Sequence, residues 1–217
     1  MRLCELLIWD LDGTITDSAP GIMNAIFYTV QKMGFSPLTR EEALAFIGPP
    51  LHDSFQKKFS LTHSDTLRAV DVFREYYSEK GIWENRLYPE IADVLHLLYE
   101  KKMTMAVATA KPQPFAEKIL CHFQLSRYFK TIAGSHFNGE KTDKAELILD
   151  VLKRLSFSQR ETACMIGDRF HDYIGARKAG VFSCAVTYGY GTRKEWDQAD
   201  YSVSSPHEIP KIVSRSL

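Results

Sequence analysis

The chain has 217 residues, of which 45% are hydrophobic, so it can bury a full core in one large domain or two small ones. Lysine plus arginine and aspartate plus glutamate number 27 each, which gives a formal net charge of zero. The basic residues form no stripe or cluster, and this argues against a nucleic-acid-binding surface.

The cysteines and the first residues bear on where the protein works. Cys4, Cys121, Cys164 and Cys184 lie far apart with no CxxC pair, and Cys4, Cys164 and Cys184 sit in or beside apolar strand-like runs. This predicts buried free thiols in a reducing compartment and not disulfides or a zinc site. The sequence shows no signal-peptide pattern and no apolar segment of about 18 residues. We therefore expect a cytoplasmic protein, monomer or homodimer, that binds neither nucleic acid nor a membrane.

The first predicted element is a short apolar run that ends at two acidic residues. Leu6 to Trp9 has no polar alternation, which is typical of a strand buried on both faces of a parallel sheet. Asp10 and Asp12 follow it, before Gly13, at the sheet edge where open parallel sheets bind ligands. Paired acids there repel each other unless a cation or a chemical step uses them. Alternatively, Asp12 and Gly13 form only a turn after the strand.

After Thr14 the pattern becomes helical. We expect four helices: one capped at Ser18 and ended by Gly34, a short one opened by a capping box at Thr39 to Glu42 and stopped at Gly48, and two over residues 51–59 and 64–79. An all-helical block directly after a first strand indicates an insertion, because a crossover helix normally leads straight back to the sheet.

From Tyr88 onward strands and helices alternate. The predicted strands cover residues 103–108, 129–133, 163–166, 183–187 and 201–203, and the predicted helices cover 89–100, 112–123, 143–155 and 170–179, with a terminal helix capped at Ser205. This alternation predicts an α/β fold with a doubly wound parallel sheet. Residues 1–15 and 82–217 form its core, and residues 16–81 form an inserted helical domain.

Polar residues recur at the ends of the predicted strands. Thr109 ends one strand, and Asp168 ends another with Asp172 one helical turn further on, so both acids can face one point. Lys144 starts a helix, where a cation opposes the helix dipole unless an anion lies nearby. Each residue has an ordinary alternative: a strand-end hydroxyl for Thr109, a favourable first-turn acid for Asp172, and a solvated surface lysine for Lys144.

Taken in chain order, these motifs resemble the haloacid dehalogenase superfamily of aspartate-nucleophile phosphatases. The strings Asp10 to Ser18, Phe46 to Leu51, Leu87 to Pro89 and Gly167 to Ala176 are similar to its phosphoglycolate-phosphatase-like branch. The resemblance covers essentially the whole chain. It implies a Rossmann-like core with a helical cap, and a Mg²⁺-dependent hydrolase of a small phosphorylated metabolite.

The resemblance also implies roles for the acidic residues. Asp10 would attack phosphorus to give an aspartyl phosphate, and Asp12 would protonate the leaving oxygen and then take a proton from the hydrolytic water. Mg²⁺ would be held by the Asp10 carboxylate, the Asp12 backbone carbonyl and Asp168. Asp172 would ligate it through water or orient the other ligands.

The resemblance also implies that three further residues bind the phosphoryl group or offset its charge. The Thr109 hydroxyl and the Ala110 N–H would bind its oxygens, and Lys144 would offset charge between Asp10 and the phosphate. Ala110 departs from the branch, which often has Ser or Asn there, so a side-chain contact is lost while the backbone donor remains.

The motifs specify the reaction class better than the substrate. The alternatives are a sugar phosphomutase of the β-phosphoglucomutase type, a pyrophosphatase and a 5'-nucleotidase. A non-catalytic phosphate-binding module is disfavoured because Asp10 and Asp12 are both present. Dehalogenation is disfavoured because dehalogenases lack the second acid, which is Asp12 here. Arg40, in the expected cap, would suit a substrate carboxylate, but an exposed capping-box arginine explains it as well.

Overall fold

The computed structural model describes residues 4–137 and 139–214. The chain forms two compact units, one of Met1–Thr16 with Leu87–Leu217 and one of Asp17–Arg86. We call them the core unit and the helical unit. That the helical unit acts as a cap for the core, with hinges near residues 15–18 and 81–87, remains a prediction.

The core unit is built on a six-stranded sheet in which every pair of neighbouring strands is parallel. Its strands are β1 (Leu6–Trp9), β4 (Thr104–Pro112), β5 (Ile132–Ser135), β6 (Ala163–Gly167), β7 (Phe182–Val186) and β8 (Tyr201–Val203). They are ordered β5-β4-β1-β6-β7-β8, so β1 lies between β4 and β6. The predicted doubly wound α/β class is confirmed, and the carboxyl ends of β1, β4 and β6 meet at one edge.

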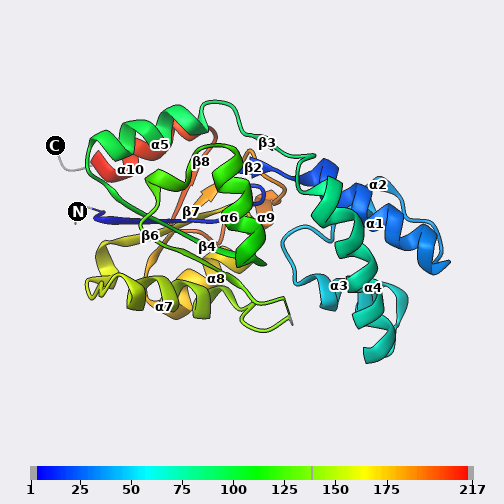
Figure 1. Ribbon diagram of the computed structural model, residues 1–217. Coiled ribbons are helices and arrows are strands. Elements are labelled where there is room, and N and C mark those ends of the chain that lie inside the picture. Colours follow the sequence, from blue (N-terminus) through cyan, green and yellow to red (C-terminus); the bar gives the residue numbers. More distant parts are fainter. Residues whose placement is uncertain (1–3, 138, 215–217) are drawn as a thin grey trace. The chain divides into compact units, whose positions relative to one another are not determined.

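The helices of the core unit are α5 (Ile91–Glu100), α6 (Gln113–His122), α7 (Lys144–Arg154), α8 (Phe170–Ala179), α9 (Arg193–Trp196) and α10 (Ile209–Ser214). Single turns of 3₁₀ helix are η2 (Ser126–Tyr128), η3 (Arg160–Thr162) and η4 (Pro206–Glu208). Helices α7 and α8 lie along one face of the sheet and α5 and α10 along the other (Figure 1). Apolar side chains of α7 and α8 fill the first face together with Leu6, Ile8, Ala106 and Met165.

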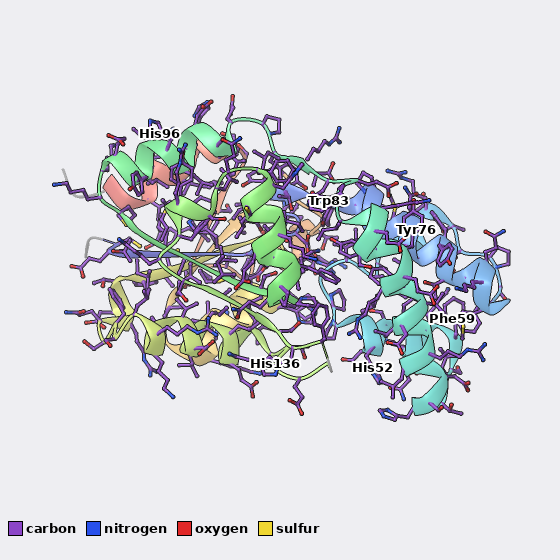
Figure 2. All side chains as sticks on the ribbon, viewed as in Figure 1. His52, Phe59, Tyr76, Trp83, His96 and His136 are labelled. Atoms are coloured by element: carbon purple, nitrogen blue, oxygen red, sulfur yellow. The ribbon has the colours of Figure 1, made fainter. Side chains whose placement is uncertain are left out.

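The helical unit has α1 (Ala19–Met33), α2 (Arg40–Leu44), α3 (Leu51–Phe59), α4 (His63–Tyr76) and a π-helical turn η1 (Tyr77–Gly81). The expected capping box forms at Thr39, whose hydroxyl accepts from the Glu42 N–H at 3.2 Å. Aromatic rings form its core, with Phe55 in edge contact with Phe46 at 5.1 Å and with Phe73 at 6.5 Å. Tyr76 lies at the end of α4 (Figure 2). The remaining strands, β2 (Thr16–Asp17) and β3 (Arg86–Leu87), form a two-stranded sheet.

Several predicted elements differ from the observed ones. Strand β5 begins three residues later than predicted, and β4 continues to Pro112, with a slip in its ladder with β5 between Thr109 and Pro112. Helix α4 ends at Tyr76 and gives way to the π-helical turn, and α2 ends at Leu44, well before Gly48. Ser205 makes no side-chain cap; instead the Glu208 carboxylate accepts from the Ser204 N–H at 2.6 Å.

The cysteines are free thiols, as predicted; Cys4, Cys164 and Cys184, which lie in or beside apolar runs, are buried, and Cys121 is exposed on α6. Burial raises the pKa of the Cys4 thiol to about 11 and that of Cys184 to about 12. In the part of the chain that the structure describes, no helix has both the length and the apolar character to cross a membrane.

Two leucines of α7 test the packing of this helix on the sheet. Leu147 is fully buried in the core, whereas Leu149 is 38% exposed on the same helix. We expect Leu147→Ala to lower the free energy of unfolding by about 2–5 kcal/mol, because it removes buried methyl groups and leaves a cavity. Leu149→Ala, the matched control, should change it by less than about 1 kcal/mol. Urea unfolding measures both, and equal losses would contradict this packing.

Candidate active site

The two acids after β1 lie on a tight turn. The Asp10 N–H donates to the Ile166 carbonyl at 2.8 Å, so the pairing with β6 holds the backbone at the end of the strand. Gly13 then adopts φ +84°, a conformation that favours glycine, and its N–H donates to the Thr16 carbonyl at 2.8 Å. The turn expected from Asp12 and Gly13 is therefore present, and it presents Asp10 and Asp12 at the sheet edge.

Asp168 and Asp172 reach the same edge from the next strand. Asp168 follows β6 and is fully buried, and Asp172 lies in the first turn of α8. The Asp172 Oδ2 accepts from the Arg169 N–H at 3.1 Å, so it is also the favourable first-turn acid considered from the sequence. Carboxylate oxygens of Asp10, Asp168 and Asp172 lie within 4.8 Å of one another. The structure thus brings together the three acids that the sequence placed on one site.

Lys144 lies among these acids and not at the surface. Its side chain is only 5% exposed, and its Nζ is 3.0 Å from Asp10 Oδ1 and 2.9 Å from Asp172 Oδ1. The ammonium also donates to the Ala108 carbonyl at 3.0 Å. The alternative of a solvated lysine is therefore wrong, and the anions needed to balance a cation at this helix start are present.

Burial and mutual repulsion set the protonation of this cluster. Burial raises the pKa of Asp10 to about 6, and the charge of Asp172 adds to this while Lys144 opposes it. Burial also raises the pKa of Asp168 well above its usual value, helped by Asp172 and Asp10. Burial alone would lower the pKa of Lys144, but the two carboxylates raise it, so the lysine stays charged. Lys144 pairs with only two of the three carboxylates, so negative charge is in excess wherever all three acids are ionised.

This excess charge is what a divalent cation would balance. The Asp168 Oδ1 is buried and has no hydrogen-bond partner among the described residues, so one oxygen of the cluster is left for a ligand. Oxygen donors from three carboxylates suit a hard cation such as Mg²⁺. The residues present therefore fit a metal ion.

Asp12 lies apart from the three acids and has a lysine of its own. The Lys111 Nζ is 3.0 Å from Asp12 Oδ1 and 2.8 Å from Asp12 Oδ2. Sequence reasoning gave Lys111 no role. The signal was its place two residues after Thr109 in a strand, because alternate residues of a strand point to the same face.

The two candidate phosphate contacts come from the end of β4. Thr109 is buried, and its Oγ1 accepts from the Lys111 N–H at 3.3 Å. The Ala110 carbonyl accepts from the Ser135 hydroxyl at 2.7 Å, which ties this strand end to β5. Thr109, Ala110 and Lys144 thus all come from β4 and the start of α7, which pack together.

A segment after β7 also holds the site, and no sequence motif marks it. The Tyr190 N–H donates to Asp168 Oδ2 at 2.7 Å, and the Trp196 indole N–H donates to the Asp168 carbonyl at 3.3 Å. The Tyr188 hydroxyl donates to the Thr14 carbonyl at 3.1 Å. The segment Tyr188–Trp196 therefore fixes the Asp168 carboxylate and the turn after Asp12 together.

Comparison with known proteins agrees with this geometry. A family model for haloacid dehalogenase-like hydrolases matches residues 7–186. A 5'-nucleotidase of Pseudomonas aeruginosa is 36% identical over 189 residues, which are 87% of this chain and 85% of that protein. A phosphoglycolate phosphatase of Agrobacterium fabrum is 30% identical over 225 residues, and the alignment covers 98% of this chain and 96% of that protein.

Two other relatives widen the comparison. A tyrosine-protein kinase of Mycobacterium tuberculosis is 33% identical over 92% of this chain and 67% of its own length. The crystal structure of a predicted phosphatase from Clostridium acetobutylicum superimposes with a TM-score of 0.93 at 36% identity, over 99% of this chain and all of that one. Similarity of sequence and of fold thus extends over the whole chain.

Gly189 tests how closely the segment after β7 packs on Asp168. A Cβ at this position would lie 2.3 Å from the Gly13 carbonyl oxygen and 2.4 Å from the Asp168 Cβ. We expect Gly189→Ala to lower the free energy of unfolding by about 1–3 kcal/mol, because the backbone must move to make room. Thermal unfolding of the metal-free protein measures this loss, and an unchanged midpoint would show that the segment is loosely held.

Proposed function

Because the chain belongs to the haloacid dehalogenase-like hydrolases and is a phosphatase, we propose that it hydrolyses a small phosphate monoester, phosphoglycolate or a similar compound, through an aspartyl phosphate. The observation that carries the proposal is the separation of the acids at the sheet edge. Asp10 lies beside Lys144, while Asp12, two residues on, is bound by a different lysine. Two carboxylates with different surroundings suit two different roles.

Asp10 is the nucleophile in this proposal. One of its carboxylate oxygens attacks phosphorus, and the bond between phosphorus and the leaving oxygen breaks. Lys144, 3.0 Å from Asp10, stays charged and offsets repulsion between the carboxylate and the incoming phosphate. The Thr109 hydroxyl and the Ala110 N–H hold phosphoryl oxygens at the end of β4. Positioning and charge neutralisation supply most of the catalysis in such a transfer.

Asp12 moves the proton in both steps. Its carboxylic acid gives a proton to the leaving oxygen as the first bond breaks. The resulting carboxylate then takes a proton from the water that attacks the aspartyl phosphate, which releases inorganic phosphate and restores Asp10. Asp12 pairs with Lys111 and is not one of the three clustered acids, which supports a side chain reserved for proton transfer.

The metal in this proposal is Mg²⁺. The Asp10 and Asp168 carboxylates and the Asp12 backbone carbonyl would hold it, with Asp172 as a further ligand through water or as an orienting group. When bound, Mg²⁺ supplies positive charge at the phosphoryl oxygens. The unpartnered Asp168 Oδ1 and the excess negative charge of the cluster support this assignment.

A 5'-nucleotide is the second candidate substrate, because the relative at 36% identity is named a 5'-nucleotidase. Release of inorganic phosphate from phosphoglycolate, nucleoside 5'-monophosphates, sugar phosphates and pyrophosphate, each with Mg²⁺, separates these candidates. A phosphomutase would instead isomerise a sugar phosphate when a bisphosphate activator is present. Phosphate release from none of the esters would contradict the proposed function.

The nucleophile can be tested with Asp10→Asn. We expect hydrolysis to fall to background, because an amide does not attack phosphorus. The matched control is Asp150→Asn, which removes an acid that pairs with Arg154 outside the site and should leave hydrolysis unchanged. In the wild type, borohydride reduction of the trapped acyl phosphate should leave a reduced residue at position 10, detected by mass spectrometry. Turnover by Asp10→Asn without deamidation would show that another group attacks.

The metal can be tested by its effect on stability. The pKa of Asp10 rises from 3.8 to about 6 on burial, so the folded metal-free protein holds this proton more tightly than the unfolded chain. Its stability therefore falls as the pH rises from about 4 to about 6, since the folded state is then made to ionise a buried acid. Mg²⁺ binds the ionised form and should raise the unfolding midpoint more at about pH 8 than at about pH 5.

Two variants control this measurement. Asp168→Asn removes a proposed ligand and should abolish most of the Mg²⁺-induced shift in the unfolding midpoint, and Asp150→Asn should keep it. EDTA should abolish hydrolysis by the wild type. A stabilisation that is the same at both pH values, or that Asp168→Asn retains, would place the metal elsewhere.

A further inference from the structure

The ion pair between Lys111 and Asp12 is a second buried charge pair at the site. Both Asp12 oxygens lie within hydrogen-bond distance of the Lys111 Nζ, at 3.0 and 2.8 Å. The side chains are only 5% and 14% exposed. A buried ammonium that donates to both oxygens of one carboxylate fixes the direction in which that carboxylate points.

The end of β4 holds Lys111 in this position. The Lys111 N–H donates to Thr109 Oγ1 at 3.3 Å, and the preceding carbonyl, of Ala110, accepts from Ser135 at 2.7 Å. The ladder with β5 slips at this point, and the next paired residue is Pro112. The backbone around Lys111 is therefore tied down on both sides, and its long side chain starts from a fixed point.

Three of the four carboxylates at the sheet edge are divided between two lysines. Lys144 pairs with Asp10 and Asp172, whereas Lys111 pairs with Asp12. The group of acids that could hold a metal contains Asp10, Asp168 and Asp172 but not Asp12. A free Asp12 carboxylate two residues from Asp10 would be a competing ligand for a cation, and the pair with Lys111 opposes this.

We propose that Lys111 is a positioning residue for Asp12: it orients the carboxylate for proton transfer and keeps it out of the metal-binding cluster. This inference rests on the proposed function. In the first step the proton leaves Asp12 for the leaving oxygen as the phosphorus–oxygen bond breaks, and the ammonium stabilises the carboxylate that results. In the second step that carboxylate takes the proton of the attacking water, still held by Lys111.

The inference predicts a dependence on the leaving group. An alkoxide is a poor leaving group and needs the Asp12 proton, whereas dinitrophenolate leaves without one. Hydrolysis of the aspartyl phosphate needs Asp12 as base whatever the substrate was. Loss of Lys111 should therefore slow the first step only for alkyl phosphates, and the second step for every substrate.

The experiment compares Lys111→Met with Lys111→Arg, which keeps the charge, and with the control Lys141→Met, which breaks a pair with Asp150 outside the site. We expect Lys111→Met to lower kcat/KM for an alkyl phosphate by about 100-fold and for 2,4-dinitrophenyl phosphate by less than about tenfold. It should also release dinitrophenolate in a burst that matches the enzyme concentration. Lys111→Arg should recover most of the loss, and Lys141→Met should show none.

A double-mutant cycle with Asp12→Asn completes the test. In Lys111→Met the buried Asp12 carboxylate is left without its lysine, which could unfold the protein, and the double variant removes that carboxylate. If Lys111 acts through Asp12, Lys111→Met should add little to the slowed hydrolysis of the aspartyl phosphate in Asp12→Asn. Equal losses for both substrates, or a full additional loss in Asp12→Asn, would overturn the inference. Failure of the proposed function is distinct, since the wild type would then form no acyl phosphate at Asp10.

Discussion

The rest of the site depends on the ion pairs that the buried ammonium of Lys144 makes. It pairs with Asp10 at the end of β1 and with Asp172 in the first turn of α8, and it stands itself at the start of α7. Buried charges are tolerated only when they are paired and hydrogen-bonded. Three elements that are distant in sequence must therefore dock correctly before any of these charges is stable. Gly175 of α8 allows this docking, since a Cβ there would lie 2.7 Å from the Lys144 Cβ.

Lys144 also leaves part of the negative charge of the cluster unbalanced. Negative charge in the cluster exceeds what one lysine balances, so the folded protein holds acids at raised pKa values and one buried carboxylate oxygen, Asp168 Oδ1, without a partner among the described residues. A divalent cation would supply the missing positive charge, and in the proposed mechanism the phosphoryl group is the electrophile that the Asp10 carboxylate attacks. Packing of the sheet and helices holds this strained electrostatic arrangement ready before substrate binds.

The sequence predicted those features that depend on local pattern. Apolar runs located β1 and β6, and the acids after them were assigned to one site because parallel strands end at one edge. The strand pattern could place Lys111 on the same face as Thr109, but it could not identify Asp12 as its partner, because that contact joins residues 99 positions apart. The segment Tyr188–Trp196 was also not predicted as part of the site. It contacts Asp168 through a backbone N–H and an indole N–H, and such hydrogen bonds produce no recognisable sequence pattern.

The division of charge between two lysines separates two demands that one site makes. In the proposed mechanism the nucleophile and the metal ligands share positive charge, whereas the acid–base group stays clear of them. Lys144 and Lys111 meet these demands from α7 and β4, both within the core unit. The helical unit has its own aromatic core around Phe55. On the prediction that the helical unit is a cap that selects the substrate, its residues can vary while the two lysine pairs stay the same, since function resides in sites and not in the fold itself.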